Sequence, residues 1–219
     1  MAWTRWAQAL GVLGGTVLLH EVAHAVAARR AGAVVREVGI GLGPVLARRR
    51  VAGVDVTLRP IPIGGFAAID IERLPPDRRA AVLLAGPLAN IGVGLLLRAL
   101  ARPLPRDRAH PDSAALPGQT RAVEVGGLLS ALVMLRRAAA AGPRALVRTA
   151  GDINLGVGLA NLLPVLPLDG GHLAAAQLEA AGASRAAVLA FKQITAGLFA
   201  WFVTRVLAAD LVRLRGSSQ

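Results

Sequence analysis

The sequence predicts a polytopic α-helical membrane protein with about four transmembrane helices, and three observations support this fold class. First, 54% of the 219 residues are hydrophobic and only 17% are charged, with a mean hydropathy of +0.54. Second, several apolar stretches reach the roughly 20 residues that a helix needs to cross a bilayer. Third, segments rich in Pro or Arg separate these stretches. Because the length leaves little room for a second domain, we expect residues 1–219 to form one membrane-embedded domain.

The first predicted span, residues 7–28, contains His20, Glu21 and His24 as its only ionisable side chains. Residues four apart on a helix lie on nearly the same face, so the two imidazoles are expected one turn apart on one side. Two neutral imidazoles in the pattern H-E-x-x-H can bind one zinc ion, and the glutamate can take a proton from water at that ion. The alternative is two buried histidines that are hydrogen-bonded to neighbouring helices.

Residues 34–71 have the composition of β-structure. Val54–Leu58 alternates apolar and polar side chains, which is typical of a strand, and Gly39–Pro44 is too rich in glycine for a helix. We expect Arg48–Arg50 at a loop tip, and Ile61–Phe66 to end the strand pairing. The segment is therefore predicted to be a β-hairpin with an exposed edge that an extended peptide could join. The alternative is an ordinary surface hairpin.

The second predicted span covers residues 79–100. Gly86 and Pro87 loosen its backbone and let another helix come close. Asn90 in the same region either makes an interhelical hydrogen bond or faces the metal cavity, and both interpretations stay open.

The segment that follows, residues 101–141, is predicted to be a loop and then a short interfacial helix. His110 lies in the loop part and is expected to be solvated. The apolar run in 122–141 is short for a span and is interrupted by Glu124, which favours an interfacial or partly buried helix.

The third and fourth predicted spans cover residues 146–166 and 186–208. Pro164 and Pro167 break the third helix at its end, and the carbonyls that they free must line a cavity or be covered by protein. In the fourth stretch, Trp201 is expected to anchor the helix at the interface.

A catalytic zinc site takes three protein ligands and leaves one position for water. Asp169, just past the break after the third span, is the carboxylate best placed to join His20 and His24, although it could instead only terminate a helix. In such a site zinc polarises a scissile carbonyl while Glu21 acts as base and then acid. Asn161 could hold the substrate backbone or the developing oxyanion.

The motifs HEVAH, AGPLAN and NLLPVLPLDGGHL, in this order, resemble the site-2 protease family of intramembrane zinc metalloproteases across residues 7–200. The pieces GIGLGP and IPIGGF resemble the membrane-associated β-hairpin of that family. The resemblance implies one zinc per chain with His20, His24 and Asp169 as ligands and Glu21 as the catalytic acid/base. It places Asn161 in the substrate-facing motif. The other expected substrate-binding residues are Asn90, Gly64 and Gly65.

The resemblance also implies a function and a location. The protein is expected in the cell membrane as a multi-pass protein, with the site towards the cytoplasmic side; the arginines flanking the spans do not settle this orientation. Its expected substrate is a single-span membrane protein, such as an anti-sigma factor or a signal-peptide remnant, cut in regulated intramembrane proteolysis. Larger bacterial members carry a PDZ domain between the second and third motifs, where this chain has too few residues for one, and a C-terminal nucleotide-sensing domain is likewise not expected. The sequence therefore does not indicate how the protein selects its substrates without a PDZ domain, and an unidentified regulatory partner is expected.

Several other functions are disfavoured. The net charge of +12 suggests nucleic acid, but aromatic residues make up only 3% and Tyr is absent, so anionic lipid head groups of the bilayer are the expected partner. Without cysteine there is no thiolate metal site. A membrane chaperone that binds helices without cutting them has no need of the base Glu21. A metal transporter needs polar groups along a whole path, whereas the charges here cluster at one depth.

Overall fold

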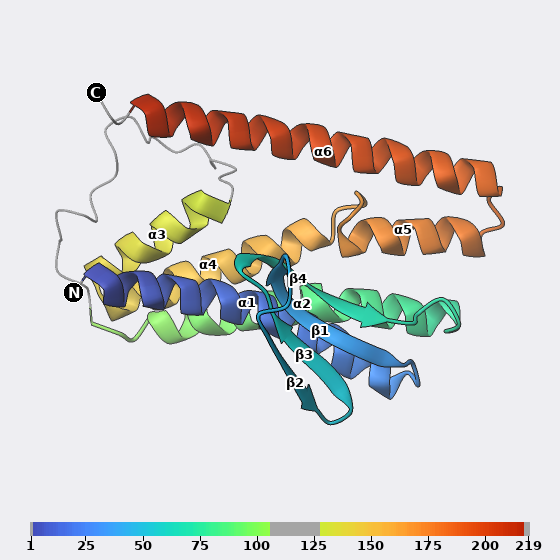
Figure 1. Ribbon diagram of the computed structural model, residues 1–219, viewed down its shortest axis with the longest axis horizontal. Helices are drawn as coiled ribbons and strands as arrows, with labels where there is room; N and C mark the ends of the chain where they lie inside the picture. Colours follow the sequence, from blue (N-terminus) through green and yellow to red (C-terminus); the bar gives the residue numbers. More distant parts are fainter. Residues whose placement is uncertain (1, 106–127, 217–219) are drawn as a thin grey trace.

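The computed structural model describes residues 2–105 and 128–216 and consists mainly of helices with one small sheet (Figure 1). The elements in chain order are α1 (Ala2–Arg30), β1 (Val35–Leu42), β2 (Ala47–Val51), β3 (Val54–Leu58), β4 (Ile61–Ile69), α2 (Pro76–Ala101), α3 (Leu128–Ala141), α4 (Pro143–Asn161), α5 (Asp169–Ala180) and α6 (Arg185–Gly216). The short helix expected within 101–141 corresponds to α3. His110 lies outside the described residues.

Three helices of the described chain are long and apolar enough to cross a membrane: Trp3–Arg30, Pro76–Ala101 and Arg185–Val206. They correspond to the first, second and fourth predicted spans. The third prediction, 146–166, overlaps α4, which has 19 residues and ends at Asn161 before the two prolines. Helix α4 is not one of the three helices that are long and apolar enough to cross a membrane. That it crosses the membrane therefore stays a prediction.

The prediction of a single hairpin was wrong, because residues 35–69 form a four-stranded sheet in the order β2-β3-β1-β4. Only β2 and β3 form a hairpin, whereas β1 pairs parallel to β3 and antiparallel to β4. Ile61–Phe66 therefore continues the pairing, within β4. Gly39 of β1 is tolerated because a neighbouring side chain covers it: it lies against the Phe66 ring on the paired strand.

The prediction that Arg48–Arg50 lie at a loop tip was also wrong, because these arginines lie within strand β2. All five residues of β2 are exposed, and this strand forms an edge of the sheet. Charged side chains on an edge strand discourage pairing with another chain. The arginine run is thus compatible with a strand because the strand is at the edge of the sheet, and a position at the edge cannot be read from local composition.

The helical core depends on close approach of α1, α2 and α4. A Cβ atom on Gly94 of α2 would lie 2.9 Å from the Gly151 oxygen of α4, and one on Gly158 would lie 2.7 Å from the Pro87 oxygen. Small residues at such positions allow helix backbones to pack in contact, which is how helices associate where no hydrophobic effect drives them together. This packing fixes α4 against α2.

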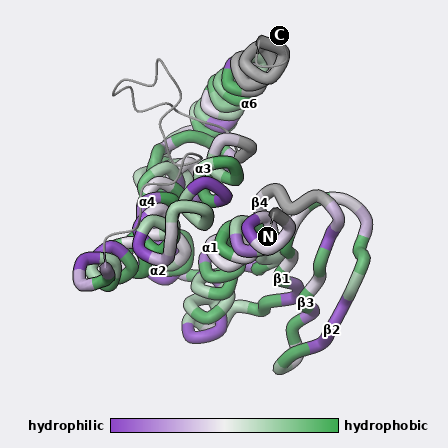
Figure 2. The backbone as a smooth tube through the Cα atoms, turned by 90° about the vertical axis from the view of Figure 1, so that its left-hand side faces the viewer, coloured by the Kyte–Doolittle hydropathy of each residue, from purple (hydrophilic) through white to green (hydrophobic). Residues whose placement is uncertain are grey.

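Helix α6 runs beside α5 and apart from the α1–α4 core (Figure 1). Val188 and Thr195 are buried, whereas its outward side carries exposed large apolar residues: Leu189, Ile194, Leu198, Trp201 and Phe202. Figure 2 shows hydrophobic residues along much of this helix and hydrophilic residues on β2. An exposed apolar helix of this length suits contact with lipid.

Candidate metal centre

Two histidines of α1 and one aspartate of α5 converge at a single point. The Nε2 atom of His20 lies 3.0 Å from the Oδ2 atom of Asp169, and that of His24 lies 3.2 Å from the same oxygen. The two Nε2 atoms are 3.1 Å apart. His20 and Asp169 are 149 positions apart in the chain, so the fold alone brings them together.

The start of α5 places the carboxylate. Asp169 is in the first turn of this helix, and the two glycines after it lie tightly against the preceding turn: Gly170 against the Leu162 backbone and Gly171 against that of Val165. Any side chain at either glycine would push α5 away from this turn. The Asp-Gly-Gly sequence thus lets the helix begin close enough to α1 for the carboxylate to reach both imidazoles.

Helix α2 supports the histidines from the other side. The Nδ1–H of His24 donates a hydrogen bond of 2.7 Å to the Val82 carbonyl, which leaves Nε2 free to act as a ligand. One turn further, Gly86 faces both rings: a Cβ atom there would lie 2.8 Å from the Nε2 of His20 and closer still to that of His24. The sequence predicted a close helix contact at Gly86, but not that the histidines make it. The role of the Val82 carbonyl has no sequence signal, because any residue provides one.

The three side chains fit a zinc ion. Ligand atoms about 2.0–2.1 Å from a tetrahedral ion lie about 3.3 Å from one another, and the three atoms described above are separated by 3.0, 3.1 and 3.2 Å. Imidazole nitrogen and carboxylate oxygen are ligand types that zinc accepts. Both histidines are buried, whereas the Asp169 side chain is 19% exposed.

Glu21 is buried beside this centre and is covered by the sheet. A Cβ atom on Gly65 of β4 would lie 2.9 Å from the Glu21 Cγ atom and 2.6 Å from the Val17 Cγ1 atom. The glycine therefore allows the β4 backbone to lie against α1 at the position of the proposed base. Gly64, beside it, is exposed and has a φ of +68°, a conformation that favours glycine.

The two predicted asparagines occupy different surroundings. Asn161 is partly buried at the end of α4, and its Nδ2 atom donates to the Val157 carbonyl of the same helix. Asn90 of α2 is completely buried, and its amide has no hydrogen-bond partner among the described residues. Contact between substrate and either residue stays a prediction.

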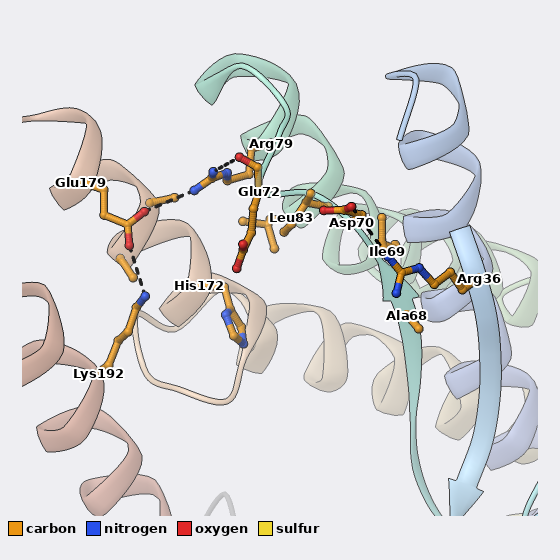
Figure 3. Close-up of a pocket in the computed structure, with 13 residues that line it drawn as sticks. Arg36, Ala68, Ile69, Asp70, Glu72, Arg79, Leu83, His172, Glu179 and Lys192 are labelled. Carbon is orange, nitrogen blue, oxygen red and sulfur yellow. Dashed lines mark hydrogen bonds and ion pairs between the residues drawn. The ribbon is translucent and has the colours of Figure 1, made fainter. Parts of the chain in front are cut away.

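A pocket of about 750 Å³ lies between the end of β4 and the helices α2, α5 and α6 (Figure 3). His172, one turn after Asp169, lines this pocket and is not part of the histidine–aspartate cluster. Glu179 of α5 accepts hydrogen bonds from Arg79 of α2 and from Lys192 of α6, which ties the three helices together at the pocket wall.

The chain was compared with known proteins. The model of peptidase family M50 matches residues 8–203. The chain belongs to peptidase family M50. The match covers most of the sequence and includes all three residues of the centre, so the resemblance to site-2 proteases is confirmed.

Named relatives of this M50 chain include zinc metalloproteases. It is 34% identical over 125 residues to the zinc metalloprotease Rip1 of Mycobacterium tuberculosis, covering 49% of this chain and 31% of the relative. It is 32% identical over 147 residues to the chloroplastic membrane metalloprotease ARASP of Arabidopsis thaliana, covering 58% and 33% respectively. The chain thus matches about a third of the length of these relatives.

A solved structure has the same fold. The site-2 protease from Methanocaldococcus jannaschii aligns with a TM-score of 0.51 over 93% of this chain and 67% of the other, at 20% sequence identity. At this identity the comparison supports the M50 fold alone.

Proposed function

We propose that this protein is an intramembrane zinc metalloprotease that hydrolyses a peptide bond within or near the transmembrane segment of a single-span membrane protein. One observation carries the proposal: His20, His24 and Asp169 converge within about 3 Å of one another in a helical core, with the buried carboxylate of Glu21 beside them. Membership of peptidase family M50 agrees with it.

The residues of the centre have separate roles in this reaction. Zinc, when bound by the three ligands, supplies a Lewis acid that acidifies the attacking water and polarises the scissile carbonyl. Glu21 accepts a proton from that water as the C–O bond forms, and gives it to the amine nitrogen as the C–N bond breaks. The hydrogen bond to the Val82 carbonyl holds His24 in the tautomer whose Nε2 atom would be free to bind the metal.

The sheet is suited to hold the substrate. A helix hides its carbonyls in hydrogen bonds, so a transmembrane substrate must be extended locally before it is cut. Strand β4 is at the edge of the sheet, and its Gly65 lies against α1 at Glu21. We assign Gly64 and Gly65 to this pairing with an extended substrate. Asn161 would hold the substrate backbone or the developing oxyanion.

The finer assignments follow the family resemblance. The substrate would be an anti-sigma factor or a signal-peptide remnant, in a cell membrane where the centre faces the cytoplasmic side, with a further partner regulating cleavage.

The pocket beyond the end of β4 would receive the residues flanking the scissile bond, because it continues from the strand that would hold the chain. The second candidate function is a membrane chaperone that binds helices on the same fold without cutting them.

The test compares the purified protein with its Glu21→Gln variant in detergent. Zinc content is measured, together with cleavage of a panel of model single-span substrates. Asp152→Asn provides a control: this exposed carboxylate of α4 pairs with Arg98, about three turns along α2 from Gly86. Zinc in all three proteins with cleavage lost only in Glu21→Gln supports the protease. Zinc without cleavage by any of them favours the chaperone, and absence of zinc from the wild type contradicts the site.

A further inference from the structure

Four buried polar atoms close to the metal centre lack hydrogen-bond partners among the described residues. They are His20 Nδ1, both amide atoms of Asn90 and the Oδ1 atom of Asn154. The remaining atoms of this kind in residues 2–105 and 128–216 are all arginine Nε atoms: those of Arg59, Arg79 and Arg136. Buried polar groups in folded proteins almost always have a partner, so the four atoms call for an explanation.

The contacts between helices place these residues at one level of the core. Helices α1 and α2 are antiparallel here, since His24 meets Val82 and His20 meets Gly86. One further turn along each helix is Thr16 on α1 and Asn90 on α2.

Helix α4 reaches the same level. The Nδ2 atom of Asn154 donates to Thr16 Oγ1 at 3.0 Å. Gly158 lies against Ile91, and Gly94 lies against Leu155, so that α4 passes α2 around Asn90. Thr16, Asn90 and Asn154 are all buried. They form a polar layer directly beyond His20.

The unpaired atoms match one another in chemistry. When His20 Nε2 is a metal ligand, the ring proton is on Nδ1, which is then a donor. The Asn90 amide offers one acceptor and a donor group, and Asn154 Oδ1 is an acceptor. The four atoms thus comprise two donor groups and two acceptors. The other proposed ligand, His24, already has the corresponding partner in Val82, whereas His20 Nδ1 has none within residues 2–105 and 128–216.

We propose that Asn90 is a positioning residue for His20. Its side-chain carbonyl accepts a hydrogen bond from the His20 Nδ1–H, directly or through one buried water, and its Nδ2 group donates to Asn154 Oδ1. The resulting chain runs from His20 through Asn90 and Asn154 to Thr16. Within this chain the Asn90 carbonyl alone contacts His20, so it is Asn90 that fixes the ring orientation and tautomer of His20 and raises its basicity towards the metal. The inference rests on the proposed zinc site and gives Asn90 a role other than contact with substrate.

The test measures zinc affinity by competition with a chelator, which needs no substrate. Asn90→Leu keeps the approximate volume and removes the acceptor, and loss of such a partner lowers metal affinity about 10- to 100-fold. Asn90→Asp keeps the acceptor for His20 and loses the donor for Asn154, so zinc affinity is expected near wild type while thermal stability falls. Asn154→Leu is the matched control, since it removes a buried amide of the same kind that does not reach His20. We expect the thermal stability of Asn154→Leu to fall, while its zinc affinity stays close to that of the wild type.

The outcomes separate this inference from the proposed function. Weak zinc binding by Asn90→Leu together with recovery in Asn90→Asp supports the positioning role. Wild-type affinity in Asn90→Leu, or equal weakness in both Asn90 variants, overturns it and leaves the zinc site intact. Absence of zinc from the wild type overturns both proposals.

An experimental structure of the zinc-loaded wild type decides the matter even if Asn90→Leu does not fold. A hydrogen bond from His20 Nδ1 to the Asn90 carbonyl, or to a water that contacts it, supports the inference. An Nδ1 atom that faces only apolar groups contradicts it.

Discussion

Gly86 of α2 lies directly against the imidazole of His24, with no room between them for even a methyl group. The same glycine faces His20, so one position on α2 limits where both rings can be. The convergence of the two histidines with Asp169 therefore depends on the absence of a side chain at this position.

Gly86→Ala is expected to disrupt the centre. Inserting a methylene group into a packed site costs about 1–3 kcal/mol, and here the rings must shift to accommodate it. A displacement of about 1 Å at a catalytic centre can lower a rate about 100-fold, so we expect loss of cleavage at that level and weaker zinc retention. Gly92→Ala on the same helix is the control, because a Cβ atom there would have no neighbour within 4 Å. Equal zinc retention and cleavage in both variants would contradict the prediction.

Gly65→Ala should separate zinc binding from catalysis. The new Cβ atom would meet the Val17 and Glu21 side chains and the Gly39 carbonyl, so either β4 or the Glu21 side chain must move. We expect cleavage to fall about 100-fold with zinc content unchanged, because the ligands lie elsewhere. Gly15→Ala on α1, where a Cβ atom meets no neighbouring atom within 4 Å, should retain both properties. Loss of zinc in Gly65→Ala would show that the glycine acts on the ligands instead.

Zinc should stabilise the protein through Asp169. A ligand that binds only the folded state adds about 2.7 kcal/mol of stability when its concentration is 100 times Kd. Added zinc is therefore expected to raise the Tm of the chelated wild type in detergent. Asp169→Ala, which lacks one ligand, should show a smaller rise at the same zinc concentration. A similar rise in both proteins would mean that the ion binds somewhere else.

The sheet should lose stability in acid through Glu37. The Thr57 hydroxyl donates a hydrogen bond of 2.6 Å to its carboxylate and the Arg59 guanidinium one of 3.0 Å, and these bonds hold the pKa of Glu37 below its ordinary value of 4.5. A lowered pKa in the folded state gives stability that is present above 4.5 and lost as the pH falls through the folded-state pKa. The difference in Tm between wild type and Glu37→Gln should be constant at neutral pH and shrink below pH 4.5.

Glu72→Gln is the control for this pH dependence, because the Glu72 side chain has no ion-pair partner among the described residues. Its difference in Tm from wild type should be small throughout. A difference for Glu37→Gln that stays constant down to the most acidic pH measured would contradict the assignment.

Local pattern predicted the three side chains that converge, and their binding of zinc stays a prediction. The spacing of His20 and His24 fixes their common face because a helix turns by a constant angle per residue. Asp169 was predicted as the third ligand from its place after a broken helix, and the structure brings it to both histidines. The apolar lengths of α1, α2 and α6 likewise predicted the helices that could cross a membrane, since this property depends on composition and length alone.

The tertiary structure decided what depends on partners distant in the chain. The parallel pairing of β1 with β3 and the strand conformation of Arg48–Arg50 were missed, because both depend on which edge of which strand is free. The contacts of Gly86 with the histidines and the unpaired amide of Asn90 arise where three helices meet. A sequence specifies the period and polarity of each segment directly, whereas the side chains that meet are determined only when all segments pack together.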